Sequence, residues 1–351
     1  MRISLFKSTI SFDVAPGQSL LDAALAASLN LPHSCKGGNC GSCRARLLQG
    51  EIYYPNGPPL GLSDAEVDDG FVLLCQARAR TDLCIETREI ATPEQVLVKR
   101  LPARIERAVT LSHDVIGLHL RLPAAEEFRF EPGQYIDIML PGGRRRSFSI
   151  ASPPHCARVL ELHVRRVAGG EFSAPLFDEK TRGSLLTIEG PLGQFVYRQG
   201  SAPMLLVGGG TGLAPLLSIL RHVVENDIER DMTVYWGVRS ERDLYAHATL
   251  EELTGRPSAG RPSARIHYVP VLSEPAPDWR GRSGWLHEAV LADIDDLEKY
   301  DVYVAGPPAM VAAARRDFVA QGADAGRLFF DSFDYAPDTL ERQRTSADTK
   351  S

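Results

Sequence analysis

No stretch of about eighteen or more consecutive apolar residues occurs in this sequence, and a membrane-spanning helix needs roughly that length. The longest candidate, Met204 to Leu220, is interrupted by glycines. The first residues also lack the apolar core of a signal peptide, so we expect a cytoplasmic protein. Basic residues are not in excess, because 39 Lys and Arg face 45 Asp and Glu, for a net charge of −6. Neither nucleic acid nor a membrane surface is therefore an expected partner.

Cysteines are few, and four of the six follow an informative spacing. Cys35, Cys40 and Cys43 form a C-x4-C-x2-C run, and Cys75 follows after 31 intervening residues. Four thiolates at this spacing are typical of a plant-type [2Fe–2S] cluster, so we predict these four cysteines as its ligands. Three glycines lie in the same loop: Gly37, Gly38 and Gly41. Without a Cβ, glycines let the backbone wrap tightly and aim N–H groups at the sulfurs.

Other interpretations of these cysteines fit less well. Structural zinc usually takes two similar two-ligand knuckles, whereas here three cysteines crowd together and the fourth stands alone. A Rieske centre needs two histidine ligands, and His33 is the only histidine nearby. Free thiols are the remaining alternative. We expect Cys84 and Cys156, which have no glycine-rich context, to be buried free thiols.

The pattern of the chain changes twice, which predicts a multidomain protein with α+β and α/β parts. The first block has β-prone runs and one helical stretch, Leu20 to Leu29, which Ser19 is placed to cap. The second has short alternating runs between turns, which is typical of an antiparallel β-barrel. The third alternates buried strands with helices, which predicts a parallel sheet. The expected divisions are residues 1–90, a linker over 91–100, residues 101–199, residues 200–335 and a disordered tail over 336–351.

The sequence patterns also place individual elements. In the second block, the expected strands are Ala103–Thr110, Val115–Leu122, Tyr135–Leu140, Ser147–Ala151, Leu160–Val167 and Ser184–Glu189. In the third, they are Met204–Val207, Met232–Trp236, Ile266–Val271 and Asp301–Ala305, with helices at Ala214–Glu225 and Pro308–Gln321.

An arginine-rich turn leads into one of the barrel strands, at Arg144 to Ser149. The simplest interpretation is a solvated loop. The alternative is a flavin site, in which Arg146 binds a pyrophosphate, Phe148 packs near the isoalloxazine and Ser149 hydrogen-bonds its reactive edge. The run Gly169 to Ser173 is a second candidate phosphate cradle, built from exposed backbone N–H groups.

A glycine run from Gly208 to Gly212 ends a buried strand and precedes a helix. It is not a G-x-G-x-x-G fingerprint, and one interpretation is a flexible turn. A pyrophosphate can, however, sit on a helix N-terminus of this kind. Ala305 to Pro308 also joins a strand to a helix. Both turns fall on the carboxyl edge of a parallel sheet, where nucleotides bind, so together they favour a nucleotide site.

These motifs together resemble the ferredoxin–NADP reductase superfamily, in the arrangement with an N-terminal plant-type ferredoxin domain. Oxygenase reductase components and the reductase of CDP-6-deoxy-glucoseen biosynthesis share this layout. The resemblance covers residues 1 to about 335. It implies a β-grasp ferredoxin domain, an FAD-binding antiparallel β-barrel and an NAD(P)-binding parallel α/β sheet.

The resemblance also implies which residues hold the cofactors. Those for FAD are Arg146, Ser147, Phe148, Ser149, His163, Val164, Arg165, Gly170, Phe172 and Ser173. Those for the nicotinamide nucleotide are Gly210, Thr211, Gly212, Pro215, Arg239, Gly306, Pro307 and Met310. The segment Asp331 to Phe333 resembles one that closes over the flavin in several relatives. Ala305 stands where many relatives have a cysteine, so any role of that thiol is absent. Ser149 is the implied catalytic helper at the flavin.

The implied function is an NAD(P)H-dependent reductase that passes electrons through FAD and the cluster to a separate oxygenase or dehydratase. We expect the protein to be a monomer. A second hypothesis is a redox-sensing module without sustained turnover. The choice of nucleotide stays open: Arg239 is suited to a 2′-phosphate, but Glu241 and Asp243 repel one, so we favour NADH.

Overall fold

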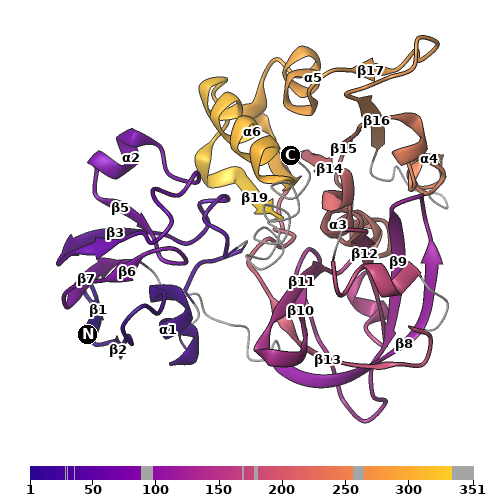
Figure 1. The fold of residues 1–351 in the computed structure, drawn as a ribbon. Coiled ribbons are helices and arrows are strands. Elements are labelled where there is room, and N and C mark those ends of the chain that lie inside the picture. The colour runs from indigo at the N-terminus through magenta and orange to yellow at the C-terminus, as the bar shows by residue number, and fades with distance from the viewer. Residues whose placement is uncertain are drawn as a thin grey trace, which may run out of the picture.

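The computed structural model describes residues 1–27, 29, 31–34, 36–87, 98–167, 170–177, 181–255 and 265–333. Three large sheets follow one another along these residues, one for each predicted domain (Figure 1). The predicted ligand Cys35, the linker up to residue 97 and the predicted tail over 336–351 lie outside the described residues. The last two residues of the predicted linker, Lys99 and Arg100, already belong to the first barrel strand.

The N-terminal domain is a five-stranded sheet in the order β2-β1-β7-β3-β5. Its strands are β1 (Arg2–Leu5), β2 (Ser11–Asp13), β3 (Arg44–Gln49), β5 (Phe71–Leu73) and β7 (Leu83–Glu86), beside the pair β4 (Ile52–Tyr53) and β6 (Arg78–Ala79). Two helices accompany them: α1 (Leu20–Ala26) and α2 (Asp64–Asp68). The Ser19 hydroxyl caps α1 as predicted, by accepting the Asp22 N–H at 3.0 Å. The helix ends earlier than Leu29, whose N–H instead closes a wide turn on the Ala24 carbonyl.

The second domain is a six-stranded antiparallel sheet in the order β11-β10-β13-β8-β9-β12. Its strands are β8 (Lys99–Thr110), β9 (Val115–Arg121), β10 (Tyr135–Met139), β11 (Arg145–Ser149), β12 (Val159–Arg165) and β13 (Leu185–Leu192). A bridge between Ile150 and Leu162 joins the two edges of this sheet. The predicted barrel is thereby confirmed, with all six expected strands present.

The C-terminal domain is a parallel sheet in the order β17-β16-β15-β14-β18-β19. Its strands are β14 (Met204–Gly209), β15 (Met232–Val238), β16 (Ile266–Leu272), β17 (Arg282–Ser283), β18 (Asp301–Gly306) and β19 (Leu328–Ser332). The helices are α3 (Leu213–Glu225), α4 (His247–Gly255), α5 (Leu286–Asp293) and α6 (Pro308–Ala320). The sequence analysis did not place β17, β19, α4 or α5.

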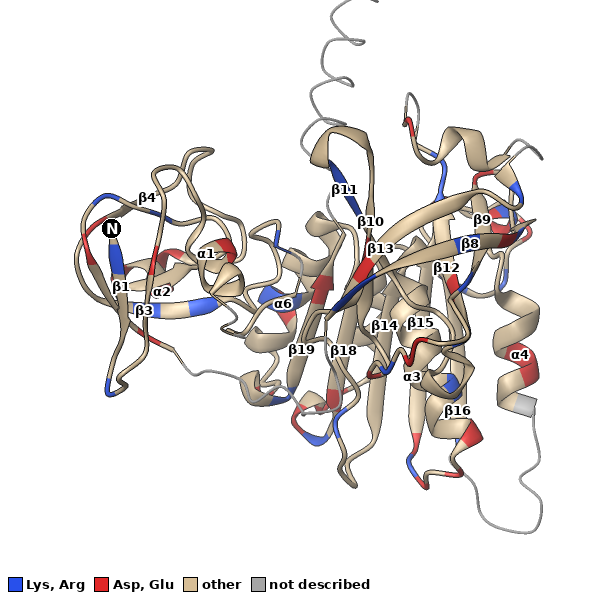
Figure 2. Ribbon diagram, turned by 90° about the horizontal axis from the view of Figure 1, so that it is seen from below, with Lys and Arg blue, Asp and Glu red and all other residues tan. Residues whose placement is uncertain are grey.

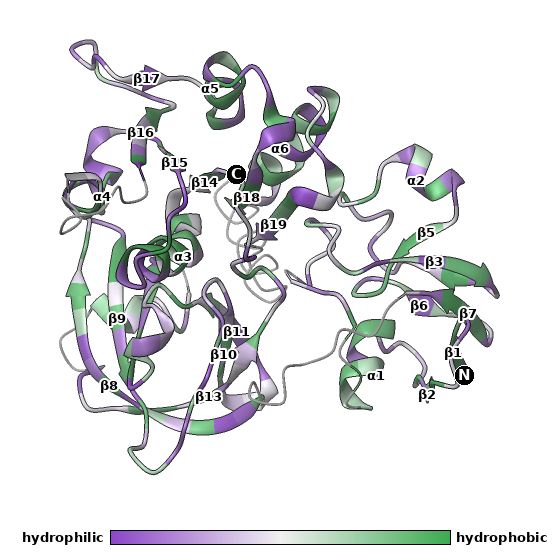
Figure 3. Cartoon of the chain, turned by 180° about the vertical axis from the view of Figure 1, so that it is seen from behind, coloured by the Kyte–Doolittle hydropathy of each residue, from purple (hydrophilic) through white to green (hydrophobic). Residues whose placement is uncertain are grey.

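The central strands of the parallel sheet are buried on both sides because helices cover both of its faces. Met204 and Leu206 face α3, whereas Leu205 and Val207 face α5 and α6. Figure 3 shows hydrophobic residues concentrated along α3. In Figure 1 the N-terminal domain lies beside α6 and β19, and the barrel lies beside α3. None of the described helices is long and apolar enough to cross a membrane.

Candidate functional site

The cysteine loop (residues 35–43) is shaped by two glycines. Gly38 and Gly41 have φ angles of +84° and +73°, which L side chains rarely adopt. A Cβ on Gly38 would lie 2.6 Å from the Gln76 side chain. The Ser42 N–H points at Cys40 Sγ, at 3.4 Å, which is the N–H to sulfur geometry expected of the loop. The backbone thus forms a tight cradle around its thiols.

The distant cysteine reaches this loop because its neighbours are bonded to it. The Leu74 N–H donates to the Cys43 carbonyl at 3.1 Å, and the Gln76 amide donates to the Lys36 carbonyl at 2.8 Å. Cys75 lies between them, and Cys40, Cys43 and Cys75 are all buried. A buried set of thiols in a glycine cradle with an inward N–H donor fits an iron–sulfur cluster.

The other thiols and the nearby histidine do not join this set. The ring nitrogen Nδ1 of His33 is hydrogen-bonded to the Leu31 carbonyl at 2.8 Å, and burial lowers the pKa of His33 to about 4. Cys84 is half-buried, and Cys156 is exposed in a short turn that begins at Pro154. The prediction of a buried thiol is therefore wrong for Cys156.

All three arginines of the arginine-rich turn make contacts within the protein. Arg144 pairs with Glu171, and Arg145 pairs with Glu189, so neither is a simple solvated side chain. Arg146, the predicted pyrophosphate ligand, donates to the Arg145 carbonyl at 2.8 Å.

The rest of β11 alternates between two environments. The Ser147 hydroxyl donates to Asp137 at 2.5 Å, whereas Ser149 is buried. The rings of Phe148 and Phe172 lie 5.4 Å apart. The strand therefore brings two predicted flavin contacts, Phe148 and Phe172, together in one place.

The predicted phosphate turn is organised by Ser173. Its hydroxyl accepts the Val167 N–H at 3.0 Å, and the Ala174 N–H donates to the Gly170 carbonyl. A Cβ on Gly170 would lie 2.7 Å from the Ser173 oxygen and 3.0 Å from the Val167 carbonyl, so a side chain here would disturb the Ser173 hydroxyl. Gly169 lies outside the described residues.

Side chains of β12 mostly serve the protein itself. His163 bonds Tyr245 Oη at 3.0 Å and Glu161 at 3.1 Å, and Val164 lies in the barrel core. Burial disfavours the charged Glu161 carboxylate, but His163 and Arg221 outweigh it and hold the pKa of Glu161 well below its usual range. Contacts of His163 and Val164 with a cofactor would therefore come from their main chain.

Arg165 is the residue of this strand that reaches the glycine run. A Cβ on Gly210 would lie 3.3 Å from its guanidinium, which also pairs with Asp114 at 3.3 Å. Gly210 has a φ of +56°, and its carbonyl accepts the Trp236 indole N–H at 2.9 Å. The structure thus joins the barrel to the turn before α3, where Thr211 is half-buried and Pro215 is buried within the first helical turn.

The two strand-to-helix turns of the parallel sheet pack against each other, as predicted from their shared edge. A Cβ on Gly209 would lie 2.5 Å from Met310 Sδ and 3.0 Å from Pro307. A Cβ on Gly212 would collide with the Ala305 carbonyl, so that turn also needs glycine. The resulting surface is mostly backbone, which suits a pyrophosphate.

Arg239 is exposed just beyond β15, and its carbonyl accepts the Glu274 N–H at 2.7 Å. The nearby acids differ. Asp243 is buried and accepts from the Ser240 N–H and hydroxyl at 3.0 and 2.8 Å, whereas Glu241 is exposed. Asp243 is thus oriented towards the backbone of its own turn.

Asp331, at the end of β19, connects two of these regions. One carboxylate oxygen accepts the Ser34 hydroxyl at 2.7 Å, and the other accepts the Ser149 hydroxyl at 3.5 Å. Phe333, the residue that follows β19, donates its N–H to the Gly306 carbonyl at 3.0 Å. The sequence analysis included Asp331 only as part of the segment Asp331 to Phe333, and it did not select Ser34. A carboxylate inside the apolar run 328–333 is the signal that a buried partner exists.

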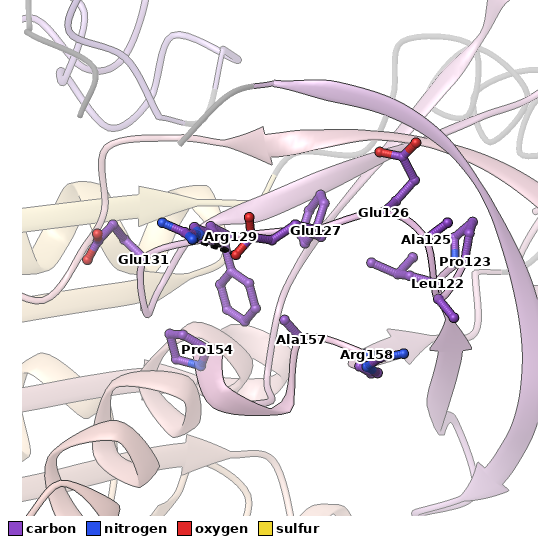
Figure 4. A pocket seen from close by; sticks show the side chains of 13 residues that line it. Leu122, Pro123, Ala125, Glu126, Glu127, Arg129, Glu131, Pro154, Ala157 and Arg158 are labelled. Carbon is purple, nitrogen blue, oxygen red and sulfur yellow. Dashed lines mark hydrogen bonds and ion pairs between the residues drawn. The ribbon is translucent and has the colours of Figure 1, made fainter. Parts of the chain in front are cut away.

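A further pocket, of about 570 Å³, opens on the barrel (Figure 4). It is lined by residues 122–131 with Pro154, Ala157 and Arg158, and none of the predicted site residues lines it.

Three family models match successive parts of the chain. Residues 4–80 match the 2Fe-2S iron-sulfur cluster binding domain, residues 102–197 the oxidoreductase FAD-binding domain and residues 206–316 the oxidoreductase NAD-binding domain. The cofactors of this chain are accordingly a [2Fe–2S] cluster, FAD and a nicotinamide nucleotide.

Similar proteins cover nearly the whole chain. A CDP-6-deoxy-L-threo-D-glycero-4-hexulose-3-dehydrase reductase of Yersinia pestis is 35% identical over 95% of this chain and 98% of its own length. The reductase component of a propane 2-monooxygenase of Mycolicibacterium goodii is 34% identical over 92% and 94%. A cytochrome P450 reductase of Amycolatopsis has a solved structure that matches with a TM-score of 0.74, at 34% identity, over 95% of this chain and 98% of that one. The chain therefore belongs to the family of iron–sulfur flavoprotein reductases that join a 2Fe-2S domain, an FAD-binding domain and an NAD-binding domain in one polypeptide.

Proposed function

We propose that this protein oxidises NADH or NADPH and delivers single electrons to a separate partner protein, either an oxygenase or a dehydratase. When bound, the nicotinamide supplies a hydride, and FAD and the cluster supply the conversion from two-electron to one-electron transfer. The protein's own residues bind, orient and separate these groups.

One observation carries this proposal: the carboxylate of Asp331 bonds both Ser34 and Ser149. Ser34 directly precedes the ligand Cys35, and Ser149 ends the strand proposed to face the flavin. A single side chain therefore spans the distance between the cysteine loop and β11. This closeness supports direct electron transfer between the flavin and the cluster.

We propose that Arg146, Gly170 and Ser173 hold the FAD phosphates and that Phe148, Phe172 and Phe333 pack near the ring. For the nicotinamide nucleotide we propose these residues: Gly210, Thr211, Gly212, Pro215, Gly306, Pro307 and Met310. Ser149 hydrogen-bonds the reactive edge of the flavin, in which role Asp331 orients its hydroxyl.

The class of partner is open between two possibilities. The relative named for a deoxyhexulose dehydrase is 35% identical, and the relatives named for oxygenases are 32–34% identical, which does not separate them. The proposed partner is therefore an oxygenase or dehydratase component. We also propose a monomer.

The test is NADH and NADPH turnover with two acceptors. Reconstituted protein is expected to reduce ferricyanide and cytochrome c with NADH or NADPH. Cys40→Ser is expected to lose the EPR signal of the cluster and cytochrome c reduction, but to keep FAD and ferricyanide reduction. Cys156→Ser, which changes an exposed thiol outside the loop, is the matched control and should behave as the wild type. Failure of the unmodified protein to reduce either acceptor would refute the function, and loss of FAD in Cys40→Ser would refute the separation into modules.

A further inference from the structure

Arg315, in the middle of α6, reaches from the C-terminal domain into the N-terminal domain. Its guanidinium donates to the Gly61 carbonyl and, at 2.9 Å, to Glu66. A Cβ on Gly41, between two cluster ligands, would collide with this guanidinium. Arg315 therefore lies directly against the cysteine loop.

The residues around Arg315 show that this contact is built into the fold. A Cβ on Gly61 would lie 2.8 Å from the Gly38 carbonyl and 2.9 Å from the Gly41 nitrogen, so Gly61 supports the loop from below. Glu66 also pairs with Arg44, which follows the ligand Cys43. Arg315 thus holds both the segment under the loop and the start of β3. Basic residues on β3 and α6 mark this junction in Figure 2.

The neighbouring arginine shows what an ordinary surface residue of this helix looks like. The Arg316 side chain is 72% exposed and pairs with Asp317 beside it, whereas the Arg315 side chain is 21% exposed and bonds only across the domain boundary in the contacts described. Two adjacent residues with the same charge therefore differ in their contact with the loop.

The environment of Cys40 makes the charge of Arg315 effective. Cys40 is buried in an apolar cluster that includes Val311, Ala314 and Phe318 of α6. An arginine stays protonated in proteins, so a positive charge lies against the loop that carries this buried ligand.

We propose that Arg315 is a positioning residue that docks the cysteine loop on α6 and raises the reduction potential of the cluster. Reduction adds one electron and no proton, so the reduced site carries one more negative charge than the oxidised site. A fixed nearby cation stabilises the more negative state. The inference depends on the cluster in this loop and not on the identity of the partner.

The experiment is an EPR-monitored redox titration of the reconstituted full-length protein, with dithionite as reductant. Arg315→Gln removes the charge. It is expected to lower the equilibrium constant for one-electron reduction of the cluster about tenfold, which is a shift of the reduction potential by about 59 mV to lower values. Arg315→Lys keeps the charge but cannot make the guanidinium's bonds to Gly61 and Glu66 together. The potential of this variant should shift by less than half as much as that of Arg315→Gln. Arg316→Gln is the matched control and should leave the potential unchanged. The potential of the FAD should be the same in all four proteins.

Glu66→Gln provides a test in the opposite direction. It removes the carboxylate that partly neutralises Arg315, and glutamine can preserve the capping box of α2. The potential of the cluster should therefore rise. The proposal is overturned if Arg315→Gln has the wild-type potential, or if Arg315→Gln and Arg316→Gln shift it equally. If Arg315→Gln takes up no cluster, an unchanged potential in both Arg315→Lys and Glu66→Gln overturns the proposal instead.

Discussion

Gly41→Ala is a perturbation whose cost can be worked out in two parts. The first part is the backbone, because a φ of +73° costs an L side chain about 1–2 kcal/mol. The second part is the collision of the new Cβ with the Arg315 guanidinium. Arg315 must then leave its bonds to Gly61 and Glu66, and losing hydrogen bonds of a charged group costs about 1.5–3 kcal/mol. The sum is about 2.5–5 kcal/mol.

Gly57→Ala is the matched control for the first part alone. Gly57 has a φ of +82°, yet no heavy atom lies within 4 Å of its ideal Cβ. The free energy of unfolding of this variant should fall by the backbone cost alone, about 1–2 kcal/mol. The two variants should therefore differ by about 1.5–3 kcal/mol, which is the contribution of the Arg315 contact.

Urea titration of the reconstituted proteins, followed by the visible absorption of the cluster, measures this difference. The midpoint should fall from the wild type to Gly57→Ala and fall further in Gly41→Ala. Combining Gly41→Ala with Arg315→Gln should cost less than the sum of the two separate effects, because the guanidinium that collides is then absent. Equal midpoints for Gly41→Ala and Gly57→Ala would refute the reasoning.

Three further predictions concern the flavin strand, the barrel contact and the nucleotide. Ser149→Ala should lower kcat for ferricyanide reduction about tenfold or more, which corresponds to about 1.4 kcal/mol at the transition state; an unchanged kcat would remove Ser149 from the site. Glu161→Gln should destabilise the protein by about 1.5–3 kcal/mol at pH 7 in urea unfolding. Because the pKa of Glu161 in the folded protein lies below its ordinary 4.5, this stabilisation is present above that pH and is lost as the pH falls below it. The difference in the free energy of unfolding between the variant and the wild type should therefore become smaller at acidic pH. Arg239→Ala should lower kcat/KM for NADPH about tenfold and leave kcat/KM for NADH unchanged. If the ratio of these two values is the same in the variant and the wild type, Arg239 does not bind the 2′-phosphate.

Local patterns were enough for much of the fold and for the cluster loop. The barrel strands were predictable because alternation and turn residues are local signals, and the capped start of α1 was predictable for the same reason. Helices α4 and α5, of nine and eight residues, were missed because so few turns leave little pattern to recognise. Strand β19 was also missed, because its position beside β18 depends on pairing over a long separation in the sequence.

The parts of the site that the sequence analysis missed are all long-range contacts. Asp331 meets Ser34 across nearly the whole chain, and Arg315 meets Gly61 across a similar separation. The residues next to Asp331 and Arg315 in the sequence do not indicate which distant residue either side chain contacts. Conversely, His163 was placed at the cofactor by resemblance, yet its ring bonds Glu161 and Tyr245, so the family motif did not show what the side chain does.

The order of the domains along the chain explains why these long-range contacts exist. Electrons are proposed to pass from the third domain to the second and then to the first, so the first and third domains must both lie close to the flavin strand. The described contacts achieve this through one short region: β18 ends at Gly306, α6 follows and carries Arg315, and the residue after β19 bonds back to Gly306. Because β19 also carries Asp331, the turn proposed to bind the nicotinamide nucleotide is continuous with both contacts to the cysteine loop.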